Sequence, residues 1–108
     1  MAIVNGTNTV LKINELGALT TNTASGVDGV AIKFTNKDDK RVLLLIGGAA
    51  GTAKIVKGDM LQSTEDLTIT TTQDEKAIVI ETGKFMKANG TVVISGLSGI
   101  TVKAIELP

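Results

Sequence analysis

The sequence has no cysteine, histidine, tryptophan or tyrosine among its 108 residues. Without cysteine and histidine, disulfides, thiol nucleophiles, histidine acid–base catalysis and the usual ligands of a structural zinc site are excluded. Phe34 and Phe85 are the only aromatic residues. The core of this single domain must therefore consist mainly of Val, Ile, Leu and Ala, each contributing roughly 1.5–3 kcal/mol when a larger aliphatic side chain is fully buried.

The chain also lacks an excess of charge and a long apolar run. Eleven basic and eleven acidic residues give a formal net charge of zero, which argues against a nucleic-acid partner and leaves little self-repulsion between copies. No run approaches the ~20 apolar residues of a membrane-spanning helix. The first ten residues, MAIVNGTNTV, contain no basic segment. We therefore expect no signal peptide, no membrane partner and synthesis in the host cytoplasm.

Short runs of Val, Ile, Leu and Thr alternate with Gly, Asn, Asp and Ser at intervals of about eight to twelve residues. This spacing predicts an all-β protein, a single antiparallel β-sandwich of about 7–8 short strands with jelly-roll or immunoglobulin-like connections. We expect one domain, in which residues 1–29 form an N-terminal strand or arm with a long loop and residues 30–108 form the sandwich body. The expected strands are Thr9–Asn14, Val30–Thr35, Val42–Ile46, Lys54–Lys57, Leu67–Thr72, Ala77–Thr82, Thr91–Ser95 and Ile100–Leu107.

Two of these runs do not alternate between apolar and polar residues. Val42–Ile46 and Ala77–Ile80 are continuously apolar, whereas Leu67–Thr70 and Ile100–Ala104 alternate. A continuous run predicts either a central strand covered on both faces or a strand whose outer face meets a partner.

The connecting segments have recognisable turn chemistry. We expect tight polar turns at Asn36–Lys40 and Gln73–Lys76, and a turn with positive φ at Asn89-Gly90. One helical turn is expected at Gly83–Ala88, with Phe85 closing one end of the core. The small, polar segment Glu15–Gly29 predicts a long loop or an extended arm.

The glycine segment that follows Val42–Ile46 raises the question of a phosphate-binding loop. In G-x-x-x-x-G-K-[ST], the second glycine would fall at Thr52 when counted from Gly47, and at Ala53 when counted from Gly48. A helix must also follow such a loop, whereas residues 54–57 have the pattern of a strand. We interpret the glycines as a connection between two strands.

No other motif indicates catalysis. The pairs Asp38-Asp39 and Glu65-Asp66 are adjacent, so on a strand their carboxylates point to opposite faces and do not form a glycosidase pair. The calcium-loop pattern is absent, and the serines have neither a histidine partner nor a G-x-S-x-G context. We therefore predict that the protein is not an enzyme and needs no metal or other cofactor.

The order of motifs from Phe34 to Pro108 resembles that of small β-sandwich head decoration and minor structural proteins of tailed bacteriophages. The resemblance rests on a series of segments in order, which are Lys40–Ile46, the K-x-G turn in Ala53–Asp59, Asp66–Ile69, Ala77–Phe85 with its E-T-G-K-F ending, and Gly90–Ile94. It implies a structural role in the virion, at the capsid surface, with the major capsid protein as partner. It implies no catalytic residues.

We therefore expect a capsid decoration protein that binds the outer surface of the head, and that also associates with its own copies, for instance as a trimer. The expected contact residues are apolar or polar side chains of the N-terminal segment, namely Met1, Ala2, Ile3, Val4, Asn5, Leu16 and Leu19. Two alternatives remain open, a tail or baseplate component and a carbohydrate-binding sandwich, although the second lacks the Trp and Tyr that stack on sugars.

Overall fold

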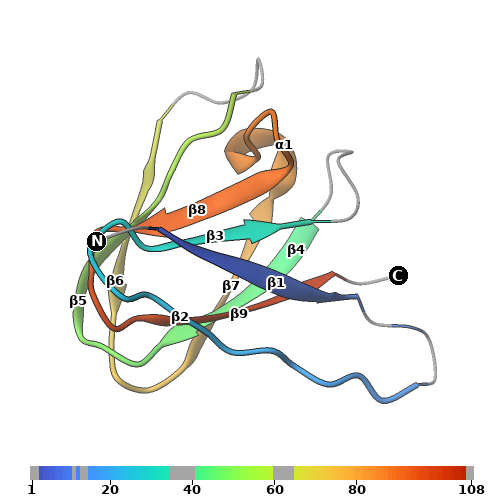
Figure 1. The fold of residues 1–108 in the computed structure, drawn as a ribbon, viewed down its shortest axis with the longest axis horizontal. Coiled ribbons are helices and arrows are strands. Elements are labelled where there is room, and N and C mark those ends of the chain that lie inside the picture. The colour runs from blue at the N-terminus through green and yellow to red at the C-terminus, as the bar shows by residue number, and fades with distance from the viewer. Residues whose placement is uncertain (1–2, 11, 13–14, 35–40, 60–64, 107–108) are drawn as a thin grey trace.

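The computed structural model describes residues 3–10, 12, 15–34, 41–59 and 65–106. They form an all-β structure with one helical turn (Figure 1). The elements in chain order are β1 (Val4–Val10), β2 (Asn22–Thr23), β3 (Val30–Lys33), β4 (Arg41–Gly47), β5 (Gly51–Ile55), β6 (Leu67–Thr71), β7 (Lys76–Glu81), α1 (Thr82–Phe85), β8 (Thr91–Ser95) and β9 (Thr101–Glu106).

The strands form one nearly closed sheet in the order β6-β5-β8-β3-β1-β9-β4-β7, with β2 paired to β9 beside β1. The two ends of this order are β6 and β7, which follow each other along the chain. The sheet therefore stays open at one place, between β6 and β7, and its middle strand β1 lies on the opposite side.

A single long hairpin, bent in the middle, generates this opening. The pairing of residues 41–55 with residues 67–81 runs from Arg41 opposite Glu81 to Ile55 opposite Leu67 without a shift in register. On one side of the bend, β4 and β7 pair and join β9; on the other side, β5 and β6 pair and join β8. The bend thus separates β6 from β7 although a short turn links them.

The glycines after β4 make this bend. Gly48 has a φ of +84°, which side-chain-bearing residues rarely adopt, and a Cβ there would lie 2.9 Å from Thr101 Cγ2. The Gly48 amide donates to Gln73 O (3.1 Å), and Thr71 Oγ1 donates to Ala49 O (2.7 Å), so both strands of the hairpin are tied together at the bend. The expectation that these glycines join two strands is confirmed.

On the opposite side, β1 passes from one neighbour to another. Its first half, Val4–Thr7, pairs in parallel with β3, and its second half pairs in parallel with β9. At the change of partner, Asn22 bonds the backbone of Thr7. Its Oδ1 accepts from Thr7 N (3.1 Å), and its Nδ2 donates to Thr7 O (3.0 Å) and to Val102 O (3.1 Å).

Gly6 makes room for this amide. A Cβ at Gly6 would lie 2.8 Å from Asn22 Cγ and 2.9 Å from Val30 Cγ1. Any larger residue would push the Asn22 side chain away from Thr7. The side-chain amide therefore replaces strand pairing at a point where β1 has left β3 and has not yet met β9.

The core lies inside the sheet and is aliphatic, as expected from the composition. Its largest fully buried side chains are Phe34, Ile32, Leu44, Ile55, Met86, Ile94 and Ile100. The helical turn α1 begins at Thr82, close to the expected position. Met86, directly after it, is fully buried, whereas Phe85 is only half-buried against the core.

The all-β class is confirmed, and seven of the eight expected strands overlap the observed ones. The expected first strand, Thr9–Asn14, is displaced, because β1 runs from Val4 to Val10 and belongs to the body of the sheet. Its residues Asn5-Gly6-Thr7-Asn8 are polar and carry no alternation that would reveal a strand. The neighbouring strands and the Asn22 amide provide its partners.

Three further expectations need correction. The pairing is not purely antiparallel, since β1 is parallel to both β3 and β9. Residues 1–29 are not separate from the body, since β1 and β2 pair with β3 and β9. The run Ala77–Ile80 lies in β7, at an end of the sheet order and not at its centre. The turn Asn36–Lys40, Thr35 and Leu107 lie outside the described residues.

We predict that Asn22→Ala lowers the free energy of unfolding by about 2–4 kcal/mol, because it leaves buried backbone groups of Thr7 and Val102 without partners. Urea unfolding followed by circular dichroism measures this change. Asn5→Ala is the matched control, since Asn5 is exposed on the same strand, and it should change stability by less than about 0.5 kcal/mol. Equal effects of the two substitutions would contradict the structural role of Asn22.

Candidate functional site

The acidic residues of the described structure serve its turns. Asp66 Oδ1 accepts from Lys57 N (2.8 Å), and Asp59 Oδ2 accepts from Ala88 N (2.8 Å). Within residues 3–10, 12, 15–34, 41–59 and 65–106, no three His, Cys, Asp or Glu residues are placed to hold a metal ion. The pair Asp38-Asp39 lies outside this part of the chain.

The first candidate surface lies on the outside of the sheet, over β4, β7 and β9. Leu43 stands opposite Val79 on one side and Ile105 on the other. In the next row, Leu45 stands between Ala77 and Lys103. Residues opposite each other share a face, and the intervening Val42, Leu44 and Ile46 are buried in the core, so both rows face outward. We call Leu43, Leu45, Ala77, Val79 and Ile105 the outer apolar face.

Charged side chains border the outer apolar face. Lys103 Nζ lies 3.0 Å from Glu75 Oε2 at one end, and Arg41 stands opposite Glu81 at the other. An apolar centre with charged residues around it is the usual layout of a protein–protein interface. The non-alternating sequence of β4 and β7 was the signal for this surface, since it left open an outer face that meets a partner.

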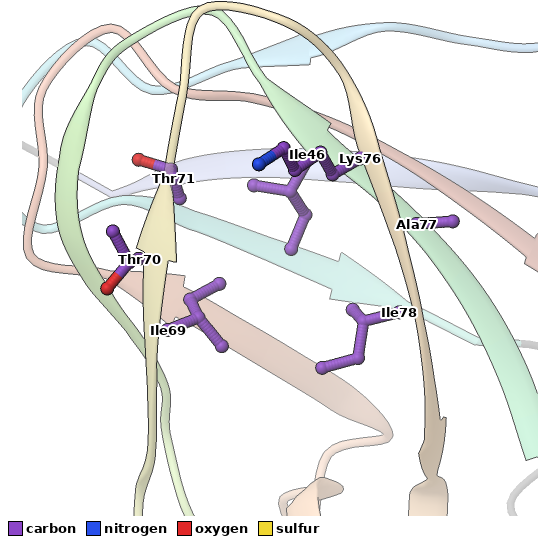
Figure 2. Close-up of a pocket in the computed structure, with 7 residues that line it drawn as sticks. All are labelled: Ile46, Ile69, Thr70, Thr71, Lys76, Ala77 and Ile78. Atoms are coloured by element: carbon purple, nitrogen blue, oxygen red, sulfur yellow. The ribbon is translucent and has the colours of Figure 1, made fainter.

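The second candidate surface is the opening between β6 and β7, which we call the β6–β7 groove. Figure 2 shows Ile69 and Ile78 pointing toward each other across the space between the two strands, with Ile46 between them. The space has a volume of about 290 Å³ and is lined by Ile46, Ile69, Thr70, Thr71, Lys76, Ala77 and Ile78.

The groove exists because the sheet is not closed. Ile69 and Ile78 face the core, yet both remain half-buried, since no strand lies between β6 and β7. Each of these two strands pairs on one side only, with β5 or with β4. Sequence could not reveal this surface, because two alternating or apolar runs joined by a short polar turn normally predict a paired hairpin.

The structure places the expected contact residues in two groups. Ile3 and Asn5 are exposed and Val4 is half-buried against the core, all at the start of β1, where Val4 N donates to Gly29 O (2.9 Å). Leu16 and Leu19 are exposed beyond the other end of β1, where Thr9 Oγ1 donates to Ala18 O (2.9 Å). Met1 and Ala2 lie outside the described residues.

Comparisons of the chain with protein-family models, with curated proteins and with solved structures find no match. None of the described helices is long and apolar enough to cross a membrane. The fold defines an all-β protein, and its function must be inferred from the two surfaces above and from the resemblance of residues 34–108.

We predict that the outer apolar face contributes little to folding. Val79→Thr, at a side chain that is 60% exposed, should change the free energy of unfolding by less than about 0.5 kcal/mol. Leu44→Ala, at a fully buried residue of the adjacent strand, should cost about 2–5 kcal/mol because it opens a cavity. Urea denaturation of both variants measures the contrast, and a large loss in Val79→Thr would show that the face is structural.

Proposed function

We propose that the protein is a non-enzymatic structural component of a tailed-phage virion, a decoration protein that binds the outer surface of the head and stabilises the shell. The observation that supports it is the outer apolar face. This face presents Leu43, Leu45, Ala77 and Val79 in adjacent rows of three paired strands, where scattered single apolar residues would need no explanation.

The face suits a protein partner better than a small molecule. It lies on the outside of the sheet, and its charges are of both signs, Lys103 and Arg41 against Glu75 and Glu81. Opposite charges around an apolar centre exclude wrong partners and fix orientation on a repeated surface. The major capsid protein is the partner that this proposal assigns, with the head surface as the location of the protein.

The proposal includes the two-layered architecture of the related virion proteins. One layer contains β6, β5, β8 and β3, and the other contains β9, β4 and β7, with β1 shared between them. The bent hairpin and the shared β1 would be the two connections between the layers. The face that meets the capsid would then be the outer side of the second layer.

The groove gives little support to a carbohydrate-binding module. Its lining consists of aliphatic side chains, Thr70, Thr71 and Lys76, with no aromatic ring on which a sugar could stack. A component of the tail would need a similar protein-binding face. Labelling of the protein in intact particles separates head from tail.

Capsid binding is tested by Val79→Asp, in a co-sedimentation assay with empty heads assembled from the major capsid protein of the same virus. A carboxylate in the centre of an apolar contact would be buried without a partner, so affinity should fall about tenfold or more, equivalent to at least 1.4 kcal/mol. The matched control is Val27→Asp, since Val27 is 63% exposed and Val79 is 60% exposed.

Loss of binding in Val79→Asp with normal binding of Val27→Asp supports the proposal. Equal binding of both variants, or no binding of the unmodified protein to heads, contradicts it. Deletion of the first eight residues is a poor test, because it removes more than half of β1 and with it pairing to β3.

A further inference from the structure

The free edge of β6 is not protected against strand addition. Its five residues, Leu67–Thr71, carry no charge and no proline, whereas β7 at the other side of the groove has Lys76 and Glu81 at its two ends. Natural proteins usually guard such an edge with charged side chains, proline or a covering segment. The edge also borders the half-buried Ile69 and Ile78, which an added strand would cover.

The same chain has an exposed segment that matches this edge. Residues 15–21 have no regular secondary structure, and every one of them is exposed, Leu16 completely. The five residues Leu16–Thr20 are uncharged, like β6, and equal it in length. Glu15 precedes them, and Lys76 lies in the groove, so the charges at one end are complementary.

A copy cannot place this segment in its own groove. In the sheet order, β6 and β1 are four positions apart, and the segment is attached to the end of β1 by the bond from Thr9 Oγ1 to Ala18 O. Figure 1 shows residues 15–21 at the lower right and β6 on the left, on opposite sides of the molecule. The occupant of the groove must come from another molecule.

We infer that the β6–β7 groove accepts residues 16–20 of a second copy of this chain, added as a strand to the free edge of β6. The backbone of the segment pairs with β6, and Leu16 packs against Ile69 and Ile78. Donor and acceptor are different surfaces, so the contact is head-to-tail and gives either a closed ring or an open chain of copies.

Sedimentation velocity over a range of protein concentrations tests this association. The unmodified protein should form species heavier than the 11.1 kDa monomer. The double variant Leu16→Asp/Leu19→Asp and the groove variant Ile69→Thr should each shift it to the monomer. Val27→Asp, an exposed valine outside both surfaces, should leave the assembly unchanged.

The absence of native cysteine allows a direct test of the contact. A mixture of Ala18→Cys and Thr70→Cys proteins, each carrying one thiol, should form a disulfide-linked heterodimer on mild oxidation. A mixture of Val27→Cys and Thr70→Cys proteins should form several times less. Thr70 is exposed in the middle of the acceptor strand, so the probe does not disturb the core.

A monomer at every concentration would overturn the inference, and so would an assembly that is insensitive to both the donor and the groove variants. Equal cross-linking of the two cysteine mixtures would also overturn it. These measurements use no capsids, so their outcome is independent of capsid binding through the outer apolar face.

Discussion

The single register of the bent hairpin determines most of this structure. Residues 41–55 and 67–81 stay paired through the bend, so β4 and β7 must turn together away from β5 and β6. The bend needs the positive φ of Gly48 and the bonds that tie Gln73 and Thr71 to the opposite strand. Both candidate surfaces follow from it. The hairpin places Leu43 beside Val79 on the outside, and it leaves β6 and β7 as the two unpaired ends of the sheet.

The opposite side of the molecule is held by one side-chain amide. Asn22 satisfies both backbone groups of Thr7 while β1 changes partner, and it can approach only because residue 6 is a glycine. This clasp also fixes where the exposed segment before β2 leaves the body. The proposed donor segment and the acceptor groove therefore lie on opposite sides of the sheet, which favours a head-to-tail assembly. A protein that coats a repeated shell could use such contacts between copies in addition to contacts with the shell.

Much of the fold could be predicted because it depends on local patterns. Polar turns at regular intervals marked β3 to β9, and the continuous apolar runs of β4 and β7 indicated a possible partner-facing surface. The prediction failed at β1, where Asn5-Gly6-Thr7-Asn8 has no apolar periodicity and gains its partners from β3, β9 and Asn22. It also could not show that β6 and β7 separate, because the turn at 72–75 has the polar composition of a turn that closes an ordinary hairpin.

The sequence by itself determined the all-β class, the positions of most strands, the aliphatic core and the lack of cysteine and histidine chemistry. These properties depend on residue type and on spacing along the chain. Only the tertiary structure decided which strands pair, that β1 is parallel to both neighbours, and which apolar side chains remain outside the core. Pairing joins residues far apart in the chain, such as Leu43 with Ile105 and Asn22 with Val102, and no local pattern encodes such contacts. The two candidate binding surfaces are products of that pairing.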